Sequence, residues 1–326
     1  MKKKRFSLCH LLGAFACGVL LVSGVSLTTP QRLSSGVYGD VNGDGMVDVD
    51  DLNEVINVIL GLPHDGTNGT RTFTVNGVTF TMVTVEGGTF TMGATAEQGD
   101  DAYDEEHPAH QVTLSGYSIG STEVTQELWL AVMGSNPSWF HGVRMDYDYS
   151  AKEEREVDYG NDLQRPVDCV TWDNCQEFIA KLNQLTGEHF RLPTEAEWEF
   201  AARGGNKSKG YKYAGSNTLD EVAWYEDNAE MVGLGNSDYG THAVGTKSPN
   251  ELGLYDMSGN VWKWVNDCRN PYSSEAQTNP TGPATGAQRV QRGGAYHSDP
   301  VSCRVSMREW NFPEDQGYDL GLRLAL

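Results

Sequence analysis

The chain has 326 residues, and 45 acidic against 24 basic residues give it a formal net charge of −21. This excess of negative charge repels nucleic acids and anionic membrane surfaces, so neither is expected as a partner. Hydrophobic residues make up 38% of the chain and aromatic residues 10%, which is enough to form a core. The 37 glycines follow no three-residue period, so collagen is excluded and a loop-rich globular fold is favoured.

Residues 1–27 have the pattern of a secretory signal peptide. Four basic residues precede a long apolar stretch, and Ser23 and Ser26 are small residues that suit a cleavage site. We therefore expect export to the periplasm, the cell surface or the medium. Simple signal cleavage is preferred over lipoprotein cleavage at Cys17 and over an uncleaved anchor. Residues 28–37, which follow, are predicted to be a linker.

Residues 38–62 combine an acidic loop with the apolar pattern of a helix. Oxygen-bearing side chains stand at loop positions 1, 3, 5, 9 and 12, and Gly45 stands at position 6, where the backbone must turn sharply. Ca²⁺ requires about six to eight oxygen ligands, and without a cation the carboxylates would repel one another. An acidic turn that binds no metal is the alternative. The predicted calcium ligands are Asp40, Asn42, Asp44, Met46 through its carbonyl, Asp48 and Asp51.

This loop and the helix after it resemble a dockerin type I repeat, because the twelfth loop position is Asp rather than Glu. A dockerin has two such repeats and this chain has one, which argues against a cohesin-type partner, since half a module leaves half of its hydrophobic face exposed. The loop is expected to stiffen a spacer or a small docking element. Residues 63–72 are polar and rich in glycine and are predicted to be a second linker.

Residues 73–326 are predicted to form the main domain, which begins with strands. Apolar and polar residues alternate on both sides of Asn76-Gly77, a pair that is typical of a two-residue hairpin turn. A further strand is expected at 85–93. After Gly205 the sequence changes to short strands and long loops rich in Trp, Gly and Asn. Helices mixed with irregular strands indicate an α+β domain with modest regular structure.

Three helices are predicted in the first part of the domain. The first covers about 126–133. The second covers 172–185 and has Cys175 on its apolar face. The third opens with a capping box, in which Thr194 and Glu197 each satisfy a backbone N–H of the first turn.

Two further segments are candidates for binding. His107 and His110 lie three residues apart in a proline-containing loop, but a nonheme-iron site needs a carboxylate that converges on them, so structural or exposed histidines are the preferred interpretation. Residues 146–159 are acidic and rich in tyrosine, without an apolar period. They are predicted to be a solvated surface loop, with a binding surface as the alternative. Trp262 and Trp264 are assigned to the core rather than to a sugar platform.

Seven ordered motifs occur in the main domain. They lie at 86–93, 123–126, 190–203, 249–255, 256–262, 289–294 and 320–323. Together they resemble the formylglycine-generating enzyme family, also called sulfatase-modifying factor, over about residues 80–326. The resemblance implies a C-type-lectin-like variant of an α+β fold. It is less specific for activity, because the superfamily includes iron-dependent oxidases and pure binding proteins.

The resemblance also implies where a copper site would lie. Enzymes of the family hold Cu(I) between two cysteine thiolates in the segment after an Arg-Gly-Gly sequence. Here the second position is Cys303, but the first is Ser298. Soft Cu(I) favours thiolates, and a protonated hydroxyl is a poor replacement. Copper is therefore not expected, with a nitrogen from His297 or His242 as the alternative ligand.

The family's calcium motif is altered as well. The resemblance places a side-chain oxygen at Asp256 and backbone carbonyls at Gly259 and Val261, which leaves a weak remnant of a calcium site. The family's last ligand is a Glu two residues later, where this sequence has Lys263. We expect the lysine ammonium to take the place of the cation and to pair with Asp256. Loss of the site is the alternative.

Two functions from different classes follow from these residues. The first is an exported, non-catalytic scaffold that binds a protein or a glycan, with Ca²⁺ in its N-terminal loop. The second is a divergent formylglycine-generating oxidase that acts on a sulfatase cysteine, with Cys303 as its candidate catalytic residue and Ser298 in place of the other cysteine.

Four cysteines lie outside the predicted signal peptide: Cys169, Cys175, Cys268 and Cys303. They permit three sets of disulfide pairings, and the sequence does not choose among these sets.

Overall fold

The computed structural model describes residues 69–148 and 151–326, and Thr70–Leu326 forms one compact unit. The predicted signal peptide and the dockerin-like repeat with its six calcium ligands lie outside the described residues. Within the described residues, no helix is long and apolar enough to cross a membrane. The first strand begins at Thr70, inside the stretch predicted as the second linker.

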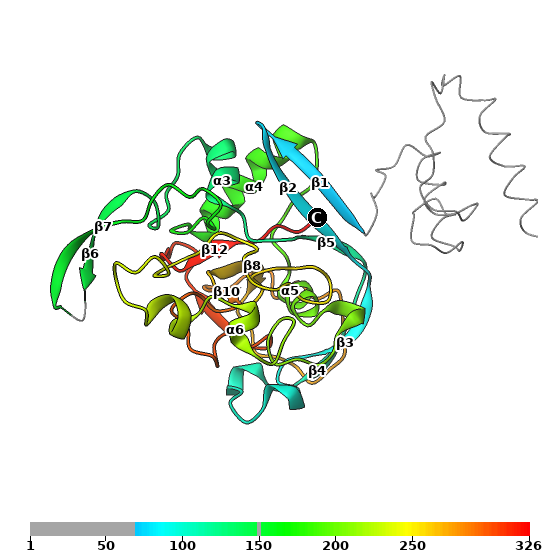
Figure 1. Cartoon of the computed structure of the whole chain (residues 1–326). Helices are drawn as coiled ribbons and strands as arrows, with labels where there is room; N and C mark the ends of the chain where they lie inside the picture. The colour runs from blue at the N-terminus through cyan, green and yellow to red at the C-terminus, as the bar shows by residue number, and fades with distance from the viewer. Residues whose placement is uncertain (1–68, 149–150) are drawn as a thin grey trace, which may run out of the picture. The chain divides into compact units, whose positions relative to one another are not determined.

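The domain opens with the predicted hairpin. Strands β1 (Thr70–Val75) and β2 (Val78–Val85) pair antiparallel, and β5 (Tyr117–Gly120) pairs with the other edge of β2 (Figure 1). The turn residues Asn76 and Gly77 both have positive φ, 49° and 85°, which matches the right-handed twist of the two strands. The hairpin prediction is confirmed.

A four-stranded sheet forms the buried centre of the domain. In spatial order its strands are β11 (Arg308–Asn311), β10 (Arg289–Arg292), β8 (Trp262–Cys268) and β12 (Leu320–Leu322). Strand β12 runs parallel to β8, and the other two pairings are antiparallel. Trp262 and Trp264 on β8 are buried, so their assignment to the core is confirmed. A separate sheet consists of β3 (Gly88–Met92), β4 (His110–Leu114) and β9 (Gln277–Thr278).

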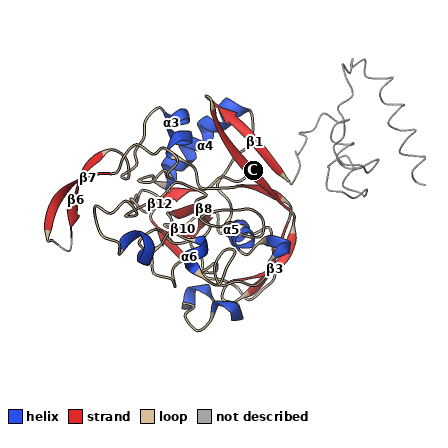
Figure 2. Ribbon diagram, in the orientation of Figure 1, coloured by secondary structure: helices blue, strands red, loops and turns tan. Residues whose placement is uncertain are grey.

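The three predicted helices are also confirmed (Figure 2). Each is capped by a threonine hydroxyl that accepts a hydrogen bond from the N–H of the third helical residue. They are α3 (Gln126–Met133), α4 (Trp172–Thr186) and α5 (Glu195–Ala202). The remaining turns of helix are α6 (Leu219–Val222), η1 (Ala96–Gln98), η2 (Asp104–Glu106), η3 (Gly205–Lys207) and η4 (Glu226–Glu230).

Helices α4 and α5 pack in different ways. Helix α4 is amphipathic, and its buried face includes Cys175, as predicted, and Phe178, whose ring stacks on Trp129 of α3 at 4.8 Å between centroids. Every residue of α5 is buried, because the helix contacts both the central sheet and the β3–β4 pair. Its three glutamates therefore lie in the interior, where each carboxylate needs a partner.

The tyrosine-rich stretch is a β-hairpin rather than the predicted solvated loop. Strands β6 (Val143–Asp148) and β7 (Glu153–Asp158) pair antiparallel in register and extend away from the rest of the domain (Figure 1). Apolar and charged residues alternate along β6 with a period of two, which is the strand period, whereas β7 has Val157 as its one apolar residue. The period is visible in the sequence of β6, but the abundance of charge on β7 conceals it.

Candidate functional site

The segment after Arg292 is held against the 256–263 loop by two glycines. Gly293 and Gly294 have φ values of 101° and 73°, which side chains disfavour. A Cβ atom on Gly293 would lie 2.7 Å from the Met257 carbonyl oxygen, and one on Gly294 would lie 2.8 Å from the sulfur of Cys303. Only glycine therefore permits this close approach, which brings the two candidate segments together.

Cys303 is completely buried in an apolar environment. Burial raises the pKa of its thiol to about 12, although the Lys263 ammonium acts in the opposite direction. Without a metal ion this shift favours the protonated thiol over the thiolate that attacks substrates. The cluster around it consists of Tyr213, Leu219, Val222, Ala223 and Tyr225.

Ser298 is buried as well, and its hydroxyl belongs to a local turn. Its Oγ accepts a hydrogen bond from the N–H of Ala295 at 2.9 Å, and its own N–H donates to the Ala295 carbonyl at 3.0 Å. The Ser298 carbonyl accepts from the N–H of Glu226 at 3.0 Å. Ser298 thus stabilises the turn that follows β10 and connects this turn to η4. A hydroxyl is suited to these hydrogen bonds, and a thiol is not.

The two histidines considered as replacement ligands have other partners. The ring of His242 stacks on Trp224 with 3.5 Å between centroids, and its Nε2 lies 3.1 Å from the Asp238 carbonyl. The Nε2 of His297 lies 3.1 Å from Oδ2 of Asp319. With one thiol, a hydroxyl engaged in a turn and two histidines that have other partners, the residues present do not fit a two-thiolate Cu(I) site.

Lys263 is the centre of a buried ionic cluster at the altered calcium motif. Its Nζ donates a hydrogen bond to the Gly259 carbonyl at 2.6 Å and lies 2.9 Å from Oε1 of Glu123, with both side chains fully buried. The predicted partner, Asp256, instead accepts a hydrogen bond from the N–H of Gly245 at 2.7 Å, so the expected Lys263–Asp256 pair is wrong. The Lys263 ammonium does contact the Gly259 carbonyl, which is one of the oxygens that the family's calcium motif offers to the metal ion.

The cluster combines two acidic and two basic side chains. Asp256 and Glu123 are the acidic ones, and the second basic side chain is Arg323, which donates to the Gly120 carbonyl at 2.6 Å and also to the Tyr255 carbonyl. Burial raises the pKa of Glu123 to about 7, although Lys263 lowers it. The N–H of Val261 donates to the same carboxylate at 3.3 Å. Lysine thus supplies a tethered positive charge between the Gly259 carbonyl and the Glu123 carboxylate.

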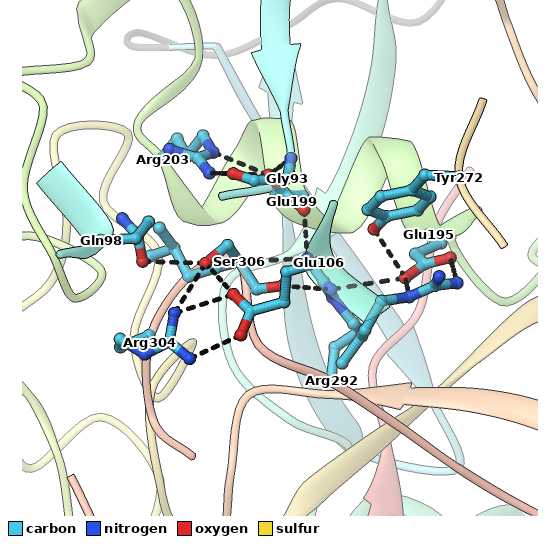
Figure 3. Close-up of polar contacts among 12 residues, drawn as sticks. Gly93, Gln98, Glu106, Glu195, Glu199, Arg203, Tyr272, Arg292, Arg304 and Ser306 are labelled. Atoms are coloured by element: carbon cyan, nitrogen blue, oxygen red, sulfur yellow. Dashed lines mark hydrogen bonds and ion pairs between the residues drawn. The ribbon is translucent and has the colours of Figure 1, made fainter. Parts of the chain in front are cut away.

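A second and larger ionic network surrounds α5 (Figure 3). Arg304 forms two hydrogen bonds with Glu106, at 2.6 and 2.8 Å, and Ser306 donates to the same carboxylate. Arg308 binds Glu195 through two nitrogens, at 2.8 and 2.7 Å. Arg292 completes the network through Glu195 and Glu199. It joins η2, α5 and β10 beneath the candidate segments.

The sequence interpretation did not identify this network, because its members come from segments far apart in the chain. His110 is buried, with Nδ1 3.1 Å from the Pro108 carbonyl and its ring 4.9 Å from that of Tyr272, which agrees with a structural role. Within residues 69–148 and 151–326, no three His, Cys, Asp or Glu side chains are grouped closely enough to hold a metal ion. One signal in the sequence could have revealed the network. The helix α5 carries glutamates on several sides, between Trp and Phe residues, which indicates that charged side chains are buried there.

An aromatic surface lies next to the Ser298 turn. We define it by Trp139, Tyr239, His297 and Tyr318. The last three contact the ring of the buried Tyr296, and Trp139 contacts Tyr318, with 5.0 to 6.4 Å between ring centroids. The carboxylate of Asp319 lies at its edge. Sequence reasoning missed this surface, because its rings come from four separate loops.

The four cysteines outside the predicted signal form no disulfide in this structure. Cys175, Cys268 and Cys303 are buried, and Cys169 is half-buried. Burial, together with the neighbouring Asp168, raises the pKa of the Cys169 thiol to about 12.

The fold and these segments define a C-type-lectin-like domain of the formylglycine-generating-enzyme type. Treponema denticola variable protein 1 superposes with a TM-score of 0.64 at 34% sequence identity, over 78% of this chain and 98% of that one. A family model described as the sulfatase-modifying factor enzyme 1-like domain matches residues 71–326. The chain belongs to this family, which confirms both the predicted family and the predicted fold class.

Relatives within the family have different names. The chain is 33% identical over 295 residues to a Paenibacillus barcinonensis protein named chaperone protein LppX, a match that covers 83% of this chain and 96% of the relative. It is 31% identical over 287 residues to the formylglycine-generating enzyme of Streptomyces coelicolor, which covers 75% of this chain and 88% of that enzyme. Family membership therefore does not decide the activity, which has to be argued from the site.

Proposed function

We propose that this protein is an exported, non-catalytic scaffold that binds a protein or a glycan. The observation that carries the proposal is the state of the two copper positions. Cys303 is a fully buried thiol whose pKa is raised to about 12 by burial, and Ser298 uses its hydroxyl to hold a turn. Cu(I) favours two thiolate ligands and only one of the two positions carries a thiol, which argues against the oxidase chemistry of the family.

The aromatic surface is the proposed binding face. Its rings combine apolar area with hydroxyl and imidazole groups, a combination that suits both sugar rings and protein surfaces. Asp319 adds a carboxylate that can accept hydrogen bonds from a ligand. Relatives named chaperone protein and variable protein support a family role other than formylglycine formation. Export and a calcium-bound loop at residues 40–51 belong to the same proposal and place the domain on a stiffened spacer outside the cytoplasm.

The catalytic part of the proposal is tested by loading the purified chain with Cu(I) and incubating it with O₂ and a cysteine-containing sulfatase peptide. We expect neither stoichiometric copper nor aldehyde in the wild type, and gain of copper binding in Ser298→Cys. Aldehyde formation by the wild type would instead establish the alternative, a divergent oxidase. A thiol reagent at pH 8 should leave Cys303 unmodified in the folded chain and modify it in denaturant, as mass spectrometry of its peptide reports.

The binding part is tested on a glycan array and on a panel of exported proteins from the source cell. Tyr318→Ala should abolish any specific signal, because its ring is 48% exposed on the aromatic surface. Phe312→Ala is the matched control, since this ring is equally exposed at 48% but lies outside the surface. Equal binding by the two variants would exclude the aromatic surface as the binding face.

A further inference from the structure

The β6–β7 hairpin has one anchored face. On this face, Asp146 accepts hydrogen bonds from the indole of Trp139 at 3.4 Å and from the hydroxyl of Tyr159 at 2.5 Å. Arg144 donates to the Ser138 carbonyl at 2.8 Å, and its guanidinium lies over the Trp139 ring. An isolated two-stranded hairpin is marginally stable in water, so these anchors hold this one in place.

The opposite face carries an exposed apolar row. Val143, Met145 and Tyr147 are 59%, 53% and 43% exposed, and they make up three of the eight large hydrophobic side chains that are exposed among the described residues. They alternate along β6, so they point to the same side of the hairpin. Three such side chains in one row form a continuous patch, which distinguishes them from exposed apolar residues that are scattered singly.

An acidic row lies directly beside the apolar one. The register pairs Val143 with Asp158, Met145 with Glu156 and Tyr147 with Glu154, and paired residues share one face of an antiparallel ladder, about 5 Å apart. Residues 143–158 contain six acidic and three basic residues, a net charge of −3. The outward face thus has two parallel rows, one apolar and one negative, each about 13 Å long.

The chemistry of this face selects its partner. A second copy of the chain is disfavoured, because it would bring another hairpin of charge −3 on a chain of charge −21 against it. Addition of a third strand is disfavoured at β6, where the N–H of Tyr147 already donates to Oδ1 of Asp146, and at β7, whose edge is charged on both sides. What remains is docking onto the face itself, as a helix covers a sheet.

We infer that the outward face of the β6–β7 hairpin binds a basic amphipathic helix of a partner protein. The apolar stripe of the helix, at positions i, i+4 and i+7, spans about 10 Å and covers Val143 and Met145 with the ring of Tyr147. Lysine or arginine residues along one flank of the stripe lie over Glu154 and Glu156. The surface is separate from the aromatic surface, so this inference does not rest on the proposed function.

The test is a titration of the full chain into a labelled helical peptide, followed by fluorescence anisotropy. The probe is an amidated peptide of about 18 residues with leucines at i, i+4 and i+7 and lysines on the flank, long enough for about five helical turns. One control peptide has glutamate in place of lysine, and another has the same composition in scrambled order. We expect binding of the basic amphipathic peptide only, weakened by added salt.

Variants locate the site. Met145→Thr keeps the strand propensity of β6 and should weaken binding at least tenfold. Leu185→Thr is the matched control, because Leu185 is also 53% exposed but lies on α4, and it should change nothing. The double variant E154Q/E156Q should bind the peptide about fivefold more weakly than the wild type at low salt. This difference in affinity should disappear near 1 M salt. Tyr318→Ala should bind the peptide normally, which separates this test from that of the proposed function.

Several outcomes would overturn the inference. They are the absence of binding up to about 1 mM, equal binding of the scrambled peptide, and binding that Met145→Thr and E154Q/E156Q leave unchanged. A concentration-dependent dimer of the wild type that Met145→Thr abolishes in sedimentation would show that a second copy occupies the face instead. Unchanged melting temperatures of the variants confirm that each remains folded.

Discussion

The interior network around α5 and the β6–β7 hairpin are both rich in charge but use it differently. In the network, Arg304 and Glu106 are fully buried and satisfy each other through two hydrogen bonds. On the hairpin, Glu154 and Glu156 are exposed, and Arg155 remains half-exposed although its partner Asp148, 2.7 Å away, is buried. A buried charge cannot exchange its partner without a large desolvation cost, whereas an exposed one can. Interior charges therefore position the segments of the domain, and those of the hairpin are available for binding.

The strongest test of this contrast is Arg304→Met. The substitution leaves Glu106 buried without its cation, so we expect the free energy of unfolding to fall by about 3–5 kcal/mol. Urea unfolding followed by tryptophan fluorescence measures it, since all eight tryptophans lie within Thr70–Leu326. Glu156→Gln on the hairpin, where the side chain is exposed, is the control and should cost less than about 1 kcal/mol. Equal losses in the two variants would remove the distinction between the regions.

Lys263→Met should have the next largest effect. It deprives Glu123 of its ion pair, but Arg323 remains in the cluster, so we expect a loss of about 2–3 kcal/mol in the same assay. A smaller loss than that of Lys181→Met, which breaks an exposed pair with Glu177, would contradict the cluster's role.

The substitution Lys263→Glu tests directly whether the lysine ammonium takes the place of a metal cation. The cluster would then hold three carboxylates and one arginine, a net charge of −2 that a calcium ion neutralises. We expect Ca²⁺ to raise the melting temperature of this variant by several degrees and a chelator to reverse the rise. The tryptophan signal of the wild type should not respond. An identical response of both proteins would show that lysine does not replace a cation.

The smallest expected effect concerns His297. Burial lowers the pKa of its imidazole, but the hydrogen bond and the charge of Asp319 outweigh this and raise the pKa above 6.5. A raised histidine pKa stabilises the fold below the unfolded pKa, and the stabilisation is lost as pH rises through the folded value. Asp319→Asn should therefore cost up to about 1 kcal/mol near pH 5.5 and nothing near pH 8.5. Glu314→Gln in the same loop serves as control and should show no pH-dependent difference.

Much of the framework was predictable from local patterns. The Asn76-Gly77 turn, the amphipathic period of α4 and the capping box at Thr194 each depend on residues close in sequence. The hairpin at 143–158 was not predicted, because charge on β7 masks the period of two. The partner of Lys263 was also missed: Glu123 lies 140 residues away, and no local pattern connects the two.

Residue identity alone established the missing thiol at position 298, the lysine at 263 and the excess of acidic residues, because these are chemical properties of single positions or simple sums. The tertiary structure decided which charges are buried and with whom they pair, that Cys303 is fully buried, and that rings from four loops form one surface. These properties depend on desolvation and on contacts between distant segments, and both arise only when the chain has folded.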